Sequence, residues 1–398
     1  MIGGWKTQEL GDLATVGAGN SAPQDEALFA DGTVPFFRTS DIGRIRFGDI
    51  STAADLLNER GARGLRRFAA GTILLPKSGA STFLNHRVMM QVDGCVSSHL
   101  ATITAKPEAA EPRFLLHFLA TVQAQDMVQD HAYPSLNLPL ISTIKVPTPS
   151  LPEQRRIVAI LDEAFEGIAT AKAHAEKNLR NAREVFESHL KSFFDDAEAA
   201  RWPRRTLREV ASEFGRGKSK HRPRNDPVLY GGPYPFIQTG DVRGSDHLIT
   251  EYTQTYSEAG LVQSKLWPKG TLCITIAANI AETGVLGFDA CFPDSVIGVV
   301  VDEGQTSSKY IEYMLGTFKA ALKAKGKGSA QDNINLGTFE TERFPFPDLK
   351  TQSEIVGTLD DMSTQVTRLE ELYQRKLAAL DELKQSLLHQ AFSGRLSS

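Results

Sequence analysis

The chain has 398 residues, with an apolar content of 41%, a charged content of 23% and a formal net charge of −4. These values are typical of a folded, soluble protein and exclude a disordered or collagen-like chain. The longest apolar stretch, Leu272–Ala281, falls far short of the roughly 20 residues of a membrane helix, and the segment after Met1 carries no signal-peptide pattern. Cys95, Cys273 and Cys291 form no CxxC pair, so we expect buried thiols in the cytoplasm.

Residues 1–150 are predicted to form a first globular domain. Short β-patterned runs at 72–75 and 101–104 are separated by glycine and proline turns, and a helical pattern follows at 112–128. The net charge of the chain does not exclude DNA binding, because positive charge can be concentrated on one face. The candidate DNA contacts in this domain are Arg44, Arg46, Arg66, Arg67, Lys77, His86 and Arg87.

Residues 151–194 are predicted to form one long helix. Apolar residues recur at steps of four and three, which is the spacing of a coiled-coil seam. At ~1.5 Å per residue, forty residues make a rod of roughly 60 Å. The seam residues expected to contact a partner helix are Ile157, Leu161 and Ile168.

Residues 195–348 are predicted to form a second globular domain, with a strand at Val296–Val301 and a helical pattern at 308–324. Basic residues between 216 and 224 alternate with glycine and lack acidic neighbours, which suits phosphate contacts, although a solvated loop has the same composition. A second basic patch at 323–327 runs into amides that could read adenine or form a simple turn. The candidates are Arg216, Lys218, Ser219, Lys220, His221, Arg222, Arg224, Gln238, Lys325, Lys327, Gln331 and Asn333.

Residues 349–398 are predicted to form a second long helix, whose seam carries larger side chains than the first. Small residues facing large ones favour antiparallel packing of the two helices, while the alternative is that each helix packs on its own domain. The second seam comprises Ile355, Leu359, Val366, Leu369, Tyr373, Leu380 and Leu387. Apolar residues off the two seams suggest a further partner surface, made of Phe165, Phe186, Leu190, Phe193, Leu372, Leu388 and Phe392.

The chain contains an internal repeat. The segment LPEQRRIVAILD at 151–162 returns 198 residues later as LKTQSEIVGTLD at 349–360, and Pro35–Ile42 matches Pro235–Val242. A solenoid repeat would have a period of roughly 20–50 residues, so the period indicates a duplicated module of one domain and one helix. The predicted fold class is therefore mixed α/β, with two similar domains, two long antiparallel helices and a pseudo-two-fold repeat.

The sequence carries no recognisable catalytic motif. No GxGxxG segment follows a strand, and neither HExxH, paired CxxC nor GxSxG is present. The Asn/Asp-Pro-Pro-aromatic motif of adenine methyltransferases is also missing. We therefore expect that the chain itself catalyses nothing.

The order of domain, LPEQRRIVAILD helix, second domain and a helix ending in LLHQAFSGRL resembles the specificity subunit of type I restriction–modification enzymes. The resemblance covers essentially the whole chain, and PFIQTGD at 235–241 and CFPDS at 291–295 also resemble that family's sequences. The second helix departs from the pattern, because it begins with Leu349–Ser353 and lacks the Pro-Glu of the first. The two partner-docking surfaces therefore need not be equivalent.

The resemblance implies a division of labour. The domains at 1–150 and 195–348 would be target recognition domains, each reading one half of a split double-stranded DNA sequence. The helices at 151–194 and 349–398 would set the spacing between the halves and dock two methyltransferase subunits, to which motor/nuclease subunits can add. S-adenosylmethionine, ATP and Mg would then belong to those partners, with no cofactor in this chain.

Two alternatives remain open at this point. The chain could serve a methylation-only or type IIB-like system, which the neighbouring genes would distinguish. It could instead be a coiled-coil scaffold with two protein-binding domains, in which case DNA would not compete with heparin for the assembly.

Overall fold

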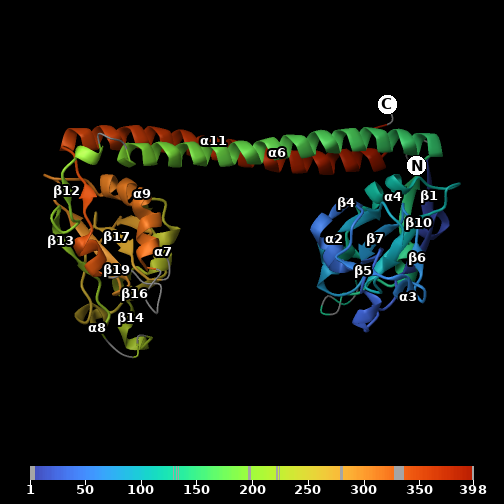
Figure 1. The fold of residues 1–398 in the computed structure, drawn as a ribbon, viewed down its shortest axis with the longest axis horizontal. Helices are drawn as coiled ribbons and strands as arrows, with labels where there is room; N and C mark the ends of the chain where they lie inside the picture. The colour runs from blue at the N-terminus through green and yellow to red at the C-terminus, as the bar shows by residue number, and fades with distance from the viewer. Residues whose placement is uncertain are drawn as a thin grey trace. The chain divides into compact units, whose positions relative to one another are not determined.

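The computed structural model describes residues 5–128, 130, 132, 134–195, 199–220, 223, 225–277, 281–326 and 336–396, except for the side chains of 320–326. These residues group into two units. The first unit comprises Met1–Glu176 and Gln374–Ser398, and the second comprises Lys177–Tyr373. Each unit contains a sheet-based domain and parts of the two long helices α6 (Leu151–Asp195) and α11 (Leu349–Phe392) (Figure 1).

A five-stranded sheet forms the centre of the first domain. Its order is β2-β10-β7-β8-β4, and β4 pairs with β8 in parallel while the other neighbours are antiparallel. The strands are β2 (Ala14–Ala18), β4 (Phe47–Ile50), β7 (Ile73–Pro76), β8 (Arg87–Met90) and β10 (Leu100–Ala105). Apolar and β-branched residues dominate these strands, as expected for a sheet with buried faces.

Smaller elements complete the first domain. A four-stranded sheet has the order β5-β3-β9-β6, and β1 pairs with β11. These strands are β1 (Lys6–Glu9), β3 (Val34–Phe37), β5 (Asp55–Leu57), β6 (Arg67–Phe68), β9 (Gly94–Val96) and β11 (Lys145–Thr148). The short helices are α1 (Leu10–Leu13), α2 (Thr39–Ile45), α3 (Glu59–Ala62), α4 (Pro112–Leu119) and α5 (Leu138–Ser142).

The helix predicted at 112–128 is shorter in the structure, because α4 ends at Leu119 and only a 3-10 turn follows at Ala124–Asp126. Asn85 accepts a hydrogen bond from the Ala124 amide at 2.8 Å. Arg87 donates to the Val122 carbonyl oxygen at 3.4 Å. Side chains from another part of the chain thus satisfy backbone groups that a continuing helix would have paired internally.

The second domain repeats this architecture. Its main sheet has the order β13-β19-β17-β18-β15, again with only the last pair parallel, and the parallel bridge between Phe236 and Cys291 matches that between Phe36 and Cys95. The strands are β12 (Arg204–Arg205), β13 (Ala211–Arg216), β14 (Tyr230–Phe236), β15 (Leu248–Ile249), β16 (Gln254–Tyr256), β17 (Leu272–Thr275), β18 (Thr283–Leu286), β19 (Val296–Val301) and β20 (Phe344–Pro345). The helices are α7 (Thr239–Gly244), α8 (Glu258–Val262), α9 (Ser308–Gly326) and α10 (Leu336–Thr341).

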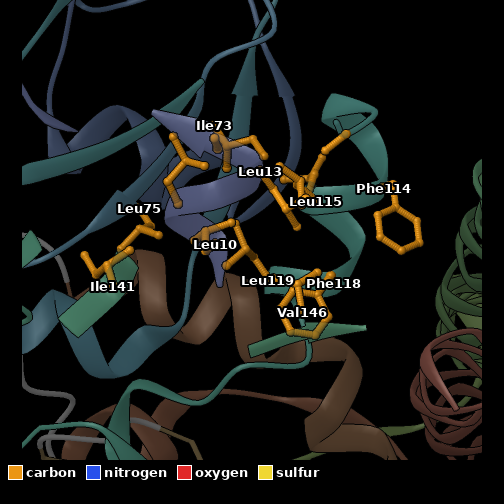
Figure 2. Close-up of a cluster of buried hydrophobic side chains, with 14 of the residues drawn as sticks. Leu10, Leu13, Ile73, Leu75, Phe114, Leu115, Phe118, Leu119, Ile141 and Val146 are labelled. Atoms are coloured by element: carbon orange, nitrogen blue, oxygen red, sulfur yellow. The ribbon is translucent and has the colours of Figure 1, made fainter. Parts of the chain in front are cut away.

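Buried side chains of the first domain form one hydrophobic cluster (Figure 2), and residues of both long helices belong to the same cluster. Leu10, Ile73 and Phe114 of the domain pack in one buried cluster with Leu161 of α6 and Phe392 of α11. The ring centroids of Phe114 and Phe392 lie 5.2 Å apart in an edge-on arrangement, which aromatic pairs favour. The domain and the helices of this unit therefore share one hydrophobic core.

The second unit has an equivalent core with the helices exchanged. Ile355 and Leu359 at the start of α11 and Phe194 at the end of α6 join the cluster of the second domain. The Phe194 ring lies 5.8 Å from that of Tyr310 on α9. In both units, one helix starts on the domain and the other helix ends on it.

These cores change the interpretation of the predicted seam. Ile157, Leu161, Ile355 and Leu359 are buried in clusters that include domain residues, so the alternative of packing on the helix's own domain holds for the start of each helix. Most off-seam residues are likewise not an open partner surface, because they lie in or against the same clusters: Phe165, Phe186, Leu190, Phe193, Leu388 and Phe392. That prediction was wrong because periodicity identifies apolar faces but not what covers them.

In the first unit, the segments of α6 and α11 run antiparallel. Arg156 donates from Nη2 to the Leu396 carbonyl oxygen at 2.9 Å, and further along α6 Lys172 forms an ion pair with Asp381. As the residue number rises in α6, that of its partner falls. Ile168, a predicted seam residue, is buried between these contacts.

In the second unit, the pairing has the same sense. Asn178 donates from Nδ2 to the Tyr373 hydroxyl at 3.1 Å, and Arg183 forms an ion pair with Glu370. The predicted seam is less covered here, because Leu369 is 39% exposed. Val366, Tyr373, Leu380 and Leu387, on α11 in the two units, are half-buried.

The glutamine of the repeated segment fixes the start of each long helix. Gln154 donates from Nε2 to the Pro149 carbonyl oxygen at 3.1 Å, and Gln352 donates to that of Pro347 at 2.9 Å. The Gln352 Oε1 atom also accepts a hydrogen bond from the Thr306 hydroxyl at 2.8 Å. Both glutamines are buried, so these bonds satisfy groups that water cannot reach.

The aspartate that ends the repeated segment ties α6 to the first domain. Asp162 forms a hydrogen bond with His117 Nε2 at 2.8 Å and an ion pair with Arg113 at 3.1 Å, both on α4. The hydrogen bond from His117 lowers the pKa of Asp162 below its usual value. The carboxylate is thus held in its charged form at neutral pH.

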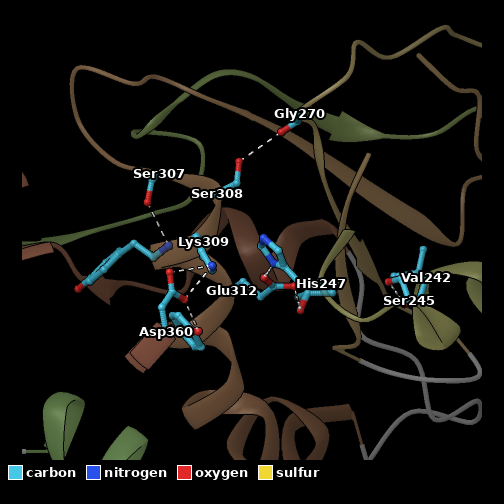
Figure 3. Close-up of polar contacts among 12 residues, drawn as sticks. Val242, Ser245, His247, Gly270, Ser307, Ser308, Lys309, Glu312 and Asp360 are labelled. Atoms are coloured by element: carbon cyan, nitrogen blue, oxygen red, sulfur yellow. Dashed lines mark hydrogen bonds and ion pairs between the residues drawn. The ribbon is translucent and has the colours of Figure 1, made fainter. Parts of the chain in front are cut away.

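The corresponding aspartate ties α11 to the second domain (Figure 3). Asp360 forms an ion pair with Lys309 at 2.7 Å and accepts a hydrogen bond from the Tyr313 hydroxyl at 2.6 Å, both on α9. Burial opposes ionisation, but the bonds from Lys309 and Tyr313 keep the pKa of Asp360 lowered. The repeated segment therefore encodes a helix-to-domain joint in each unit.

Candidate nucleic-acid interface

A tight turn follows the first strand of the main sheet in each domain. A Cβ atom on Gly19 would lie 1.9 Å from the Val96 carbonyl oxygen, and one on Gly217 would lie 2.1 Å from that of Phe292. No other residue fits at either position. The amide of Lys218, the residue after this second glycine, donates to the Phe292 oxygen at 3.1 Å. The turn therefore fixes where the following side chains leave the surface.

A short helix borders this turn in each domain. Asn58 caps α3 by accepting from the Gly61 amide, and Ser257 caps α8 in the same way by accepting from the Gly260 amide. In both helices the glycine packs against a backbone carbonyl, so a side chain is excluded there. The two helices hold the same position in the repeated fold.

Hydrogen bonds join the turn to the segment after each short helix. In the first domain the Arg66 amide donates to Asn20 Oδ1 at 2.9 Å. In the second domain the Lys220 amide donates to Gln263 Oε1 at 2.6 Å, and the Ser264 hydroxyl donates to the Lys218 carbonyl oxygen at 2.9 Å. We call these sites the first junction (residues 19–20 and 59–67) and the second junction (residues 216–220 and 258–265).

The first junction draws its positive charge from α3 and the segment after it. Arg60, Arg63 and Arg66 are exposed, and the structure gives them no ion pair with any residue that it describes. Arg66 lies over the Phe68 ring at 6.0 Å. Arg67 is also exposed, but it forms an ion pair with Glu59 at 3.0 Å.

The second junction draws its positive charge from the other side, the turn after β13. Lys218 and Lys220 are exposed and have no carboxylate partner among the described residues. Arg216 donates from Nε to the Asp294 carbonyl oxygen at 2.7 Å, which orients its guanidinium without neutralising it. Both junctions are therefore basic, although different segments supply the unpaired cations: Lys265, which corresponds to Arg66, is ion-paired with Glu213.

The remaining predicted residues of the first domain divide into surface and core positions. Arg44 is exposed and lies 3.7 Å from Asp41, and Arg46 follows α2 with a left-handed φ of 67°. Lys77 and His86 are half-buried. Burial, followed by the charges of Arg46 and Arg87, lowers the pKa of His86, so this imidazole favours the neutral form.

The structure places Arg87 in the core rather than on the surface. Its side chain is 2% exposed, and it donates to the carbonyl oxygens of His86 at 2.8 Å and Val122 at 3.4 Å. Burial lowers its pKa to about 10. The side chain holds the loop before β8 against the turn after α4, and it has no free surface to offer DNA.

Gln238 takes part in a helix start that occurs in both domains. Its backbone amide donates to Asp241 at 2.8 Å, and that of Arg38 donates to Asp41 at the same distance. Arg38 also forms an ion pair with Asp55. The half-buried Gln238 side chain therefore sits at the first turn of α7, and the equivalent position in the first domain is basic.

Several predicted contacts fall outside what the structure describes. His221, Arg222, Arg224, Lys327, Gln331 and Asn333 lie outside the described residues, and Lys325 lies in α9 with an undescribed side chain. Ser219 lies in the second junction and is half-buried. The list of candidate contacts lacks Asn20, Arg60 and Arg63, which become junction residues only when the turns and short helices of the two domains are compared.

Within the described part of the chain, no three His, Cys, Asp or Glu residues are placed to hold a metal ion. Cys95, Cys273 and Cys291 are buried free thiols, and burial raises the pKa of each. None of the described helices has the length and apolar character needed to cross a bilayer. What the described surface offers is a basic site, repeated once in each domain.

Comparison with known proteins identifies the repeat. The family described as the type I restriction modification DNA specificity domain matches residues 2–179 and again residues 201–378. The chain belongs to this family. The predicted resemblance is therefore confirmed, as is the predicted class of two mixed α/β domains with two long helices.

Individual relatives are more distant. The specificity subunit of the type I restriction enzyme EcoR124I/EcoR124II of Escherichia coli is 25% identical over 293 residues, which cover 67% of this chain and 66% of that subunit. A chain from work on complex assembly and conformational transition of the type I R-M system matches with a TM-score of 0.81 and 20% identity, over 99% of this chain and 98% of its own. The HsdS subunit of Thermoanaerobacter tengcongensis matches with a TM-score of 0.64 and 20% identity, over 99% and 97%.

Proposed function

We propose that this chain is the DNA-specificity subunit of a type I restriction–modification complex, in which each domain binds one half of a split DNA target. The observation that carries the proposal is the position of the two junctions. Arg60, Arg63 and Arg66 make the site basic in one domain, and Lys218 and Lys220 make it basic at the same place in the other. Positive charge occurs at the same site in both domains, although different segments supply the unpaired cations. This indicates that both domains bind the same kind of anionic partner.

Duplex DNA meets this description. Unpaired lysine and arginine side chains bind phosphates and release counterions, which supplies affinity without sequence preference. The chain is acidic overall, with a net charge of −4, so the attraction must come from local patches. The Arg66 backbone is hydrogen-bonded to Asn20, and the Lys218 backbone to Phe292, so the two turns fix backbone segments that carry cations, as base reading requires.

We further propose that methyltransferase subunits dock on the long helices. In the second unit, α6 and α11 border an apolar groove of about 500 Å³ lined by Ala182, Val185, Met362, Val366 and Leu369. Val185 is 53% exposed and Leu369 is 39% exposed, although both are apolar. This surface suits a protein partner. The chain itself would be non-catalytic, and S-adenosylmethionine, ATP and Mg would be bound by the methyltransferase and motor/nuclease subunits.

The test is to co-express the chain with its methyltransferase subunit in a methylation-free host and to map N6-methyladenine by single-molecule sequencing. We expect a split motif with a fixed spacer. Complex formation with an active methyltransferase but without sequence-specific methylation would contradict the proposal and favour a protein-binding scaffold. Cleavage of unmethylated target in the presence of a motor/nuclease subunit would separate a complete restriction system from a methylation-only one.

Charge reversals in the junctions test the sites themselves. We expect Arg60→Glu and Lys220→Glu each to lower DNA affinity and to reduce the slope of log affinity against log salt by about one. Lys6→Glu and Lys350→Glu, exposed cations outside the junctions, are the matched controls and should leave the slope unchanged. Equal effects of the junction and control variants would contradict the assignment.

A further inference from the structure

Val262 is an apolar side chain in an unusual position. It ends α8 and is 87% exposed, the highest value among the large apolar side chains that the structure describes. The helix that carries it is firmly held, because Ser257 caps its first turn and Gly260 packs against the Leu229 carbonyl oxygen. Exposure of the valine is thus a property of an ordered element.

The two residues after Val262 are hydrogen-bonded to the backbone of two lysines. The next residue, Gln263, accepts a hydrogen bond from the Lys220 amide at 2.6 Å, and Ser264 donates to the Lys218 carbonyl oxygen at 2.9 Å. Unpaired lysines beside an apolar tip disfavour an apolar protein partner, because covering the tip would desolvate their charges. A DNA groove accommodates both, since lysines can contact phosphates while an apolar group contacts the 5-methyl group of thymine.

The first domain carries a different residue at the same position. Arg63 follows α3 as Val262 ends α8, each two residues after the glycine that packs the helix, Gly61 or Gly260. Arg63 is exposed and has no ion pair with any described residue. An arginine here can donate two hydrogen bonds to the major-groove edge of guanine, which a valine cannot do.

We infer that Val262 and Arg63 occupy one base-reading position in the two domains, with Val262 contacting a thymine methyl group in one half-site and Arg63 a guanine in the other. This inference rests on the proposed function and deepens it, because it names side chains that give the two domains different base preferences. The other lysines and arginines of the two junctions supply the phosphate contacts that position these two side chains.

Thymine replacement tests Val262 directly. The complex with the methyltransferase is bound to its mapped target duplex, and each thymine of the half-site read by the second domain is replaced in turn by uracil, which lacks the methyl group. We expect one replacement to weaken binding about fourfold, the effect of losing one buried methyl group. Val262→Ala should weaken binding to the thymine duplex and abolish the difference between thymine and uracil.

Val228→Ala is the matched control, because Val228 is 57% exposed on the neighbouring 3-10 turn and should leave the uracil effect intact. For the first domain, Arg63→Val should relax one guanine position of its half-site in methylation mapping and leave the other half-site unchanged. A uracil effect that persists in Val262→Ala, or the lack of any such effect in the parent complex, would overturn the inference while leaving DNA binding in place.

Two other outcomes are distinguishable. If the parent complex lacks sequence-specific binding altogether, the proposed function itself fails. If Val262→Ala weakens assembly with the methyltransferase and binds DNA normally, the valine serves a protein partner and the inference is wrong.

Discussion

His247 illustrates how a single residue differs between the two repeats. It has a left-handed φ of 68°, like Arg46 with 67° at the equivalent turn, and its Nδ1 atom is hydrogen-bonded to Glu312 on α9 (Figure 3). The bond to Glu312 raises the pKa of His247; burial and Lys309 oppose this, and Asp360 adds to it. The first domain joins β4 to α4 through an ion pair between Asp49 and Arg113 instead.

The stability of the second domain should therefore depend on pH. Because the folded-state pKa of His247 is raised above the unfolded value of about 6.5, its contribution is fully present below that value and is lost as pH rises through the folded-state pKa. We expect His247→Gln to remove this loss, as measured by urea denaturation between about pH 6 and pH 8.5.

His86→Gln is the control, because the pKa of His86 is lowered in the folded state. Its contribution should have the opposite sign, being present at high pH and lost as pH falls. Identical pH dependence in the two variants and the parent chain would contradict both assignments.

At the scale of elements, each long helix contributes side chains to the hydrophobic cores of both domains, one at its start and one at its end. Its start is fixed by a buried glutamine, Gln154 or Gln352, and about two turns further by Asp162 or Asp360. Its end packs aromatic residues on the other unit's domain, as Phe392 does in the first unit. The helices therefore act as structural members of the domains rather than as separate linkers.

Phe392→Ala should destabilise the first unit. The ring is 8% exposed and lies 5.2 Å from Phe114 and 5.4 Å from Phe118, so its removal leaves a cavity at the shared core. We expect a loss of about 3 kcal/mol in the free energy of unfolding, measured by urea denaturation. Leu372→Ala, which truncates a 51% exposed residue of the same helix, should cost less than about 1 kcal/mol. Equal losses would show that α11 does not end in the core.

For the whole molecule, we propose that the paired helices determine the distance between the half-sites. Each of the two units pairs its own segments of α6 and α11 in antiparallel fashion. Two recognition domains joined by helices of fixed length would bind half-sites at a fixed separation. In simpler DNA-binding proteins, the geometry of the dimer sets the half-site spacing in the same way. The spacer would then be a property of the helices, and the bases read would be a property of the domains.

Lengthening both helices tests this separation of roles. One heptad inserted after Asn178 and another after Tyr373, which contact each other, keep the pairing in register. Seven residues add about 10 Å, so we expect methylation mapping to give a spacer longer by roughly three base pairs with unchanged half-sites. Insertion in one helix alone should disrupt pairing and abolish methylation. A changed half-site with an unchanged spacer would refute the model of helices as a ruler.

Much of this architecture is already determined by the sequence. The period of 198 residues identifies two modules, and the 3.5-residue apolar spacing identifies two long helices. Both signals depend only on the order of residues along the chain. The basic segment at 216–220 could likewise be recognised from composition. These features can be recognised without knowing which distant residues contact each other.

Only the tertiary structure decided what each side chain does. Arg87 looks like other arginines in sequence, but the fold buries it, and the seam residues Ile157 and Ile355 proved to share domain cores. The equivalence of Arg63 and Val262 also emerged from the structure, because each lies two residues after the packed glycine of a capped short helix. Burial and proximity arise from contacts between segments far apart in the chain. The local sequence pattern does not show which distant segments come into contact.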